Sequence, residues 1–94
     1  MKNLSLRIHN YLDEFLSKVI NIECYNFECR NNNVRISFYD EAYMQYRFYN
    51  LCNVFIDNVS SNFPIKRVHR KKRDEEPDDM GGLMSAEMII TFYY

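Results

Sequence analysis

The sequence has little glycine and proline and no tryptophan. Gly and Pro occur twice each among 94 residues, so few positions favour hinges or tight turns. The sequence also has no run of about eighteen apolar residues, and its first stretch, MKNLSLRIHNYLDEF, carries polar and acidic residues where a signal peptide needs an unbroken apolar segment. We therefore expect a soluble, unexported, cytoplasmic protein without a membrane partner.

Disulfide and metal signatures are also missing. Cys24, Cys29 and Cys52 are an odd number of cysteines, which favours reduced thiols in a cytosolic setting. A bridge between Cys24 and Cys29 is difficult to close, because five residues of extended strand span roughly 16 Å and a disulfide tolerates about 7 Å between Cα atoms. The cysteines, His9 and His69 show no paired C-x-x-C spacing. We expect neither a metal ion nor a cofactor.

No catalytic motif or phosphate-binding loop is present. His9 lies one helical turn before Asp13, but no nucleophile is placed beside it by spacing. The adjacent carboxylates Asp13 and Glu14 point about 100° apart on a helix, so they do not form a two-carboxylate site. We therefore expect that the protein is not an enzyme.

The composition is that of an ordinary globular chain. Hydrophobic residues make up 47% and charged residues 27%, unlike the apolar-poor composition of disordered proteins. A chain of 94 residues can bury one modest core but not two. We predict a single domain over residues 1–94, with abundant aromatic area from eight Tyr and seven Phe.

The apolar pattern predicts a helix followed by a β-hairpin. Over Asn3–Ile20, apolar residues recur at spacings of three and four, which marks one buried stripe. These residues are Leu4, Ile8, Leu12, Phe15, Leu16 and Val19. Two short segments rich in β-branched and aromatic residues, Ile22–Arg30 and Val34–Tyr39, flank a turn of three asparagines. In the second segment, Val34, Ile36 and Phe38 are expected to face the core. They alternate with Arg35, Ser37 and Tyr39, which are expected to face solvent or a partner.

A second helix and a second hairpin follow. Asp40 is a good N-cap and Glu41 suits the positive end of the helix dipole, so we predict a helix from there to residues 60–62, before Pro64. The segment IKRVHRKKR then leads through the turn-prone DEEPDDMGG to the alternating strand SAEMIITFYY. We expect a charged hairpin loop at about 71–83. The order α-β-β-α-β-β predicts an α+β fold, with two helices packed on one face of a four-stranded antiparallel sheet.

The predicted second helix has a core face and an outer face. The core arc of about 100° contains Met44, Phe48, Leu51, Cys52, Phe55 and Val59. Tyr43 and Tyr46 point to the opposite side, and Tyr49 lies at the boundary, where its ring can pack and its hydroxyl can reach water. The outer face also holds three polar residues, Asn50, Asn53 and Asp57. Large amphipathic rings on a short polar surface favour protein recognition, although exposed tyrosines are common and the first helix can also cover them.

Two runs of opposite charge follow the second helix. They consist of the cations Lys66, Arg67, Arg70, Lys71, Lys72 and Arg73 and the acids Asp74, Glu75, Glu76, Asp78 and Asp79. Because cations fall on both faces of an extended segment, neither face can be buried beyond Val68, and we predict a protected edge strand. The alternative is a nucleic-acid site formed by Arg67, Arg70, Lys71 and Arg73. No aromatic residue is interleaved with these cations, and the acidic run either masks them or belongs to a protein-binding surface.

In size and composition the chain resembles the small phage-encoded inhibitors of bacterial defence, which include anti-CRISPR proteins. The shared features are a short chain, many aromatic residues, reduced cysteines and the lack of motifs. The resemblance implies a small protein that occupies a partner. We predict a non-enzymatic protein-interaction module whose partner surface comprises Tyr43, Tyr46, Asn50, Asn53, Asp57, Asp74, Glu75, Glu76, Asp78 and Asp79. The alternative is a nucleic-acid-binding module that uses the basic strand 66–73.

Overall fold

The fold follows the predicted order of helices and strands. The structure, a computed structural model, describes residues 2–19, 22–40, 45–74 and 86–94. Its elements are α1 (Lys2–Lys18), β1 (Glu23–Cys29), β2 (Asn33–Asp40), α2 (Gln45–Asn62), β3 (Arg67–Asp74) and β4 (Ala86–Tyr93). Within these segments, no helix has the length and apolar character needed to cross a membrane.

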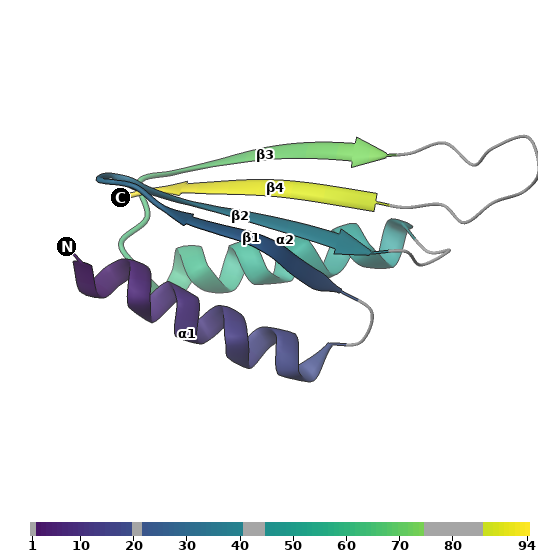
Figure 1. Cartoon of the computed structure of the whole chain (residues 1–94), viewed down its shortest axis with the longest axis horizontal. Helices are drawn as coiled ribbons and strands as arrows, with labels where there is room; N and C mark the ends of the chain where they lie inside the picture. The colour runs from purple at the N-terminus through teal and green to yellow at the C-terminus, as the bar shows by residue number, and fades with distance from the viewer. Residues whose placement is uncertain (1, 20–21, 41–44, 75–85) are drawn as a thin grey trace, which may run out of the picture.

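The four strands form one antiparallel sheet in the order β1-β2-β4-β3. Both helices lie on the same face of this sheet (Figure 1). The predicted α+β fold, with a four-stranded antiparallel sheet and two helices against it, is therefore confirmed. Because β4 pairs with β2 on one side and with β3 on the other, β1 and β3 form the two edges. We call the face of the sheet that points away from the helices the open sheet face.

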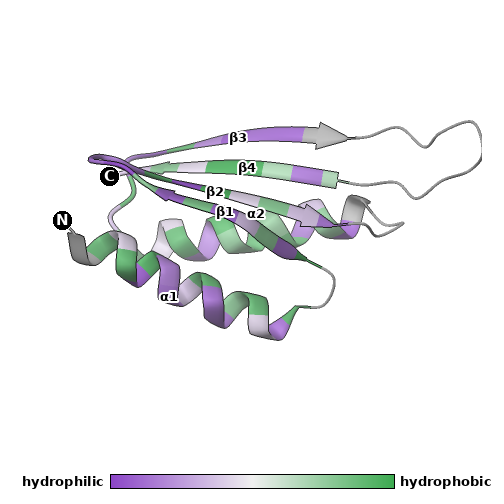
Figure 2. Ribbon diagram, viewed as in Figure 1, coloured by the Kyte–Doolittle hydropathy of each residue, from purple (hydrophilic) through white to green (hydrophobic). Residues whose placement is uncertain are grey.

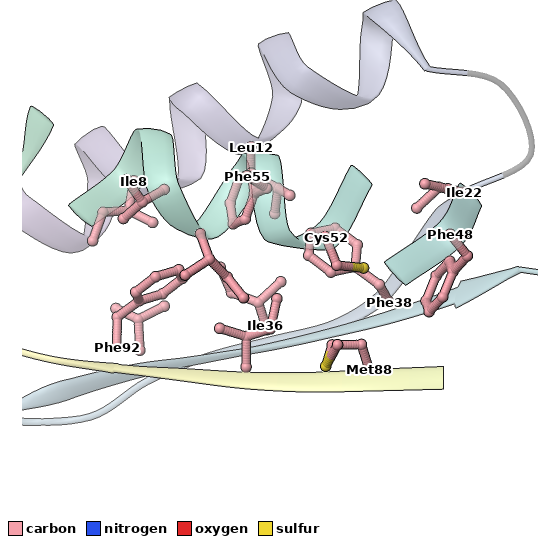
Figure 3. Close-up of a cluster of buried hydrophobic side chains, with 14 of the residues drawn as sticks. Ile8, Leu12, Ile22, Ile36, Phe38, Phe48, Cys52, Phe55, Met88 and Phe92 are labelled. Atoms are coloured by element: carbon pink, nitrogen blue, oxygen red, sulfur yellow. The ribbon is translucent and has the colours of Figure 1, made fainter. Parts of the chain in front are cut away.

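The hydrophobic core lies between the helices and the sheet (Figure 3). Apolar residues at three- and four-residue spacing on the helices meet apolar residues at alternate positions of β2 and β4. The buried apolar residues are Leu4, Ile8, Leu12, Ile22, Val34, Ile36, Phe38, Phe48, Cys52, Phe55, Ile56, Val59, Ala86, Met88, Ile90 and Phe92. The core-facing residues predicted for β2 are confirmed, and Ile56 is a member of the α2 core that the helical arc did not predict.

Phe55 of α2 is central to this core. Its side chain is fully buried, and its ring stacks on that of Tyr11 with 5.6 Å between centroids. The ring centroids of Phe15, Phe38 and Phe92 lie 5.1, 5.3 and 6.0 Å from that of Phe55. Both helices and the two central strands therefore pack on one ring.

The end of β2 differs from the prediction. Asp40 is the last residue of β2, is buried, and pairs in register with Ala86 of β4. The residues that Asp40 is predicted to cap begin at Glu41 and lie outside the described part of the chain, since α2 is described from Gln45, so the capping role of Asp40 stays a prediction. Pairing with β4 therefore extends β2 one residue beyond the predicted strand, which ended at Tyr39.

The open sheet face is polar, but not all of its side chains are accessible. Arg35, Ser37 and Tyr39 of β2 alternate with the core residues, as predicted. Ser37 is nevertheless only 3% exposed, so of the two alternatives for this set, solvent or a partner, solvent is excluded for Ser37. Its short side chain lies in the centre of the sheet, in register between Asn26 of β1 and Ile89 of β4, and these longer side chains surround it.

The three cysteines are free thiols that differ in accessibility. Cys29 is exposed, Cys24 is half-buried, and Cys52 is buried on the core face of α2. Burial raises the pKa of Cys24 and raises the pKa of Cys52 to about 12, because removal from water disfavours the thiolate.

Thiol labelling should follow this order. With an aromatic disulfide reagent at about pH 8, we expect Cys29 to react first, Cys24 more slowly, and Cys52 only after denaturant is added. Peptide mass spectrometry at successive times would identify the modified residue. Rapid labelling of Cys52 in the folded protein would contradict the packing of α2.

Candidate functional site

The outer face of α2 holds part of the predicted partner surface. Its described polar members are Asn50 and Asp57, which are exposed, and Asn53, which is half-buried. Val54 lies among them with 50% of its surface accessible, an apolar contribution that the sequence did not reveal. Tyr43 lies outside the described residues, and the side chain of Tyr46 does as well, although Tyr46 belongs to α2.

The acidic run is the other part of the predicted partner surface. Asp74 is the last residue of β3 and pairs in register with Ala86. Residues Glu75, Glu76, Asp78 and Asp79 lie outside the described part of the chain. The role of this run in partner recognition therefore stays a prediction.

Tyr49 is packed more completely than predicted. Its ring lies 5.2 Å from the ring of Phe48, and Nζ of Lys72 lies 4.7 Å from its centroid. Its hydroxyl oxygen is buried and has no hydrogen-bond partner among the residues that the structure describes. The expectation that this hydroxyl reaches water is wrong, because β3, which is distant in sequence, places Lys72 over the ring.

A groove, here called the α1–β1 groove, runs between α1 and the edge strand β1. It consists of two adjoining hollows that share His9 and Phe27. The larger hollow, of about 360 Å³, has a mainly apolar lining that also includes Ser5, Leu6 and Cys29. The smaller hollow, of about 230 Å³, is also lined by Leu12, Asp13, Leu16, Cys24, Tyr25 and Asn26.

A strand edge forms one side of this groove. β1 pairs with β2 along one edge, and no strand in the described segments pairs with its other edge. Leu6 of α1 is 60% exposed at the larger hollow. The rings of His9 and Phe27 meet edge-on, with 4.7 Å between their centroids, and line both hollows. An apolar hollow beside a strand edge can accept an added strand.

Carboxylates lie in the α1–β1 groove and along β1. Asp13 lines the groove, and Glu23 is exposed at the start of β1. Glu28, near the end of β1, has a lowered pKa, first because the side-chain amide of Asn26 donates a hydrogen bond of 3.0 Å to it and second because Arg30 lies 3.3 Å away. At neutral pH Glu28 is therefore ionised. The register of Glu28 with Arg35 and of Glu23 with Tyr39 places these two carboxylates on the open sheet face beside the free edge of β1, whereas Asp13 lies in the groove itself.

The α1–β1 groove was not predicted from the sequence. The available signal is Leu6, an apolar residue that falls outside the stripe marked by Leu4, Ile8 and Leu12. On its own, Leu6 is a single exposed leucine of the kind that needs no explanation. It becomes part of a groove only because the tertiary structure places β1 beside α1.

β3 carries a dense group of exposed basic side chains, here called the basic edge. Its described members are Lys66, which directly precedes the strand, and Arg67, His69, Arg70, Lys71 and Lys72. β3 is an edge strand, as predicted, and it is hydrophilic along most of its length beside the more apolar β4 (Figure 2). No carboxylate in the described residues lies within ion-pair distance of these side chains. The side chain of Arg73 is outside the described part, but its backbone pairs with Glu87.

Aromatic rings from other elements accompany the basic edge. Cζ of Arg67 lies 4.3 Å from the ring centroid of Tyr93, and Nζ of Lys72 lies 4.7 Å from that of Tyr49. Tyr93 belongs to β4 and Tyr49 to α2, so neither ring is near the cations in sequence. The sequence pattern, which shows no aromatic residue among the cations, therefore misses both contacts.

Three surfaces are candidates for function: the outer face of α2, the α1–β1 groove and the basic edge. No group of three or more side chains that could hold a metal ion occurs within the described segments. No protein-family model matches the sequence, and no curated protein matches it. The choice among the surfaces is therefore made on their geometry and chemistry.

Proposed function

We propose that this protein is a non-enzymatic protein-interaction module that binds an extended segment of a partner protein in the α1–β1 groove. The supporting observation is an apolar hollow of about 360 Å³ directly beside an edge of β1 that no described strand occupies. A partner strand added to this edge would bond its backbone to β1 and place alternate side chains in the hollow. Main-chain hydrogen bonds would supply affinity, and the hollow would supply specificity.

The carboxylates of β1 select the chemistry of the partner segment. Glu23 and Glu28, on the open sheet face of β1, favour cationic side chains on that face of the bound strand, whereas the hollow beside Leu6 favours apolar ones on the other. Successive residues of a strand point to opposite faces, so both preferences are met by a segment in which apolar residues alternate with lysine or arginine.

The two edges of the sheet differ in their protection against pairing. β3 carries basic side chains along its length, a common means of preventing edge-to-edge contact. β1, with the sequence ECYNFEC, contains neither lysine nor proline. Its register shift between Cys24 and Asn26 interrupts regular pairing at one point. Strand addition is therefore expected at β1, along Asn26 to Cys29.

An NMR titration with a short blocked peptide of alternating lysine and valine tests this proposal. We expect changes in amide chemical shift to concentrate in β1 and α1. The variant Leu6→Lys should weaken binding about tenfold or more, because it places a cation at the hollow and repels the basic peptide.

Val54→Lys is the matched control, since it makes the same change at a similarly exposed apolar residue on α2. It should bind the peptide as the unmodified protein does. If Val54→Lys lost binding and Leu6→Lys retained it, the partner site would be assigned to α2 instead of the groove. Absence of binding by the unmodified protein would refute the groove as a site for basic strands.

The outer face of α2 is a second candidate for partner recognition. Val54, half exposed between Asn50 and Asp57, gives this face a small apolar centre with a polar rim. A partner segment that is bound at either surface is no longer accessible for its other contacts. This is the mode of action implied by the resemblance to small phage-encoded inhibitors.

A further inference from the structure

We infer that the basic edge is a binding site for single-stranded nucleic acid, independent of the α1–β1 groove. Exposed cations that lack a described carboxylate partner form the electrostatic footprint of a phosphate-binding surface. The groove lies at β1 and the basic edge at β3, on opposite edges of the sheet. Three strand spacings, roughly 14 Å, separate the two edges, so a ligand at one leaves the other accessible.

The strand register divides the basic edge between two faces. On the open sheet face, the pairs across β3 and β4 are Arg67 with Tyr93, His69 with Thr91 and Lys71 with Ile89. Arg70 and Lys72 instead pair with the core residues Ile90 and Met88, so they lie on the helix side. Arg35 of β2 is in register with Thr91 on one side and with Glu28 of β1 on the other, so the positive charge of the open sheet face extends from β3 to β2 and ends there.

Tyr93 adds a stacking surface beside these charges. Its side chain is partly exposed, and the guanidinium of Arg67 lies 4.3 Å from its ring centroid. Nucleobases stack on aromatic rings and on guanidinium planes, and this pair offers both. The described helices lie on the other side of the sheet (Figure 1), so the pair can be approached by a flat ligand. Bases of a single strand are free to stack there, whereas bases of a duplex are stacked on one another.

Acidic groups limit the site to one part of the open sheet face. Glu87 lies near the opposite end of β4 from Tyr93, and its Oε1 accepts a hydrogen bond from the hydroxyl of Tyr25. Glu23 and Glu28 lie on the far edge strand β1, and Glu28, which is in register with Arg35, bounds the site on that side. The geometry places the phosphates along Arg67 and Lys71 and the bases towards Tyr93.

Fluorescence anisotropy with labelled oligothymidylate, oligouridylate and a duplex of matching length, at low and at physiological salt, tests this inference. We expect the intact chain to bind single strands more tightly than the duplex, with an affinity that falls as salt rises. Comparison of the two single strands shows whether DNA or RNA is preferred. The double variant Arg67→Glu, Lys71→Glu should weaken binding about tenfold or more and reduce the salt slope by about two.

The double variant Lys18→Glu, Arg47→Glu is the matched control. It changes the net charge equally, but at exposed positions on the two helices, and it should retain most of the binding. Tyr93→Leu should weaken binding about fivefold or more without changing the salt slope, because it removes stacking and not charge. Thermal melting of every variant confirms that it is folded at the assay temperature.

Several results would overturn the inference. One is the absence of single-strand binding at low salt, and another is tighter binding of the duplex. Equal losses in the β3 and helix double variants would show that net charge alone is responsible. A larger loss in Arg70→Glu, Lys72→Glu than in Arg67→Glu, Lys71→Glu would place the ligand on the helix side and refute the site on the open sheet face.

Discussion

Replacement of Phe55 by alanine should lower the free energy of unfolding by about 3–5 kcal/mol. The ring is fully buried and contacts aromatic rings from α1, β2 and β4. Truncation removes these contacts and leaves a cavity that the neighbouring rings fill only by leaving their preferred rotamers. Urea denaturation followed by circular dichroism should show a lower midpoint with an unchanged slope.

Val54→Ala is the control for this experiment. Val54 lies next to Phe55 in α2 but is half exposed, so its truncation should change the free energy of unfolding by less than about 1 kcal/mol. If Val54→Ala proved more damaging than Phe55→Ala, the rotation of α2 about its axis would be wrong, and with it the assignment of its core and outer faces.

Neutralisation of the acidic run should raise the affinity for single-stranded nucleic acid. Amides at positions 74, 75, 76, 78 and 79 remove five negative charges and move the formal net charge from −1 to +4 without changing the chain length. Asp74 ends the strand that carries the basic edge, so the run begins close enough to repel a phosphate bound there. We expect binding of oligothymidylate to tighten roughly tenfold or more at low salt and to lose most of this gain at physiological salt.

A matched variant separates this local effect from net charge. It replaces by amides five other acids, Asp13, Glu14, Glu23, Glu28 and Asp57, and reaches the same formal net charge. Its affinity should rise much less, because these carboxylates lie on α1, β1 and α2. Equal gains would show that the run has no special position relative to the site. No gain in the first variant would favour the other role allowed by the sequence, in which the acidic run is part of a protein-binding surface.

The kinds and order of the elements could be predicted because each depends on a local pattern. The stripe of Leu4, Ile8 and Leu12 has the period of a helix, and the alternation of Val34 and Ile36 has the period of a strand. In a chain that buries one core, such a pattern also indicates which face of each helix or strand packs against the core. The same reasoning identified β3 as an edge strand, since cations on both of its faces exclude burial.

Single positions were less predictable where neighbours decide the environment. Asp40 lies beyond the predicted strand, which ended at Tyr39, but it continues β2 because it pairs with Ala86. The hydroxyl of Tyr49 has the helical angle of a boundary residue but is buried, since Lys72 lies over its ring. In both cases the deciding contact comes from a strand far along the chain.

The sequence by itself determined the fold class, the core faces of the elements and the exposure of the basic strand. The tertiary structure alone decided which surfaces adjoin one another. It placed β4 between β2 and β3, which brought Tyr93 beside Arg67, and it placed β1 beside α1, which formed the α1–β1 groove. The physical reason is that periodicity records how each segment divides its residues between core and solvent, whereas binding surfaces are assembled from segments whose proximity depends on long-range strand pairing and packing.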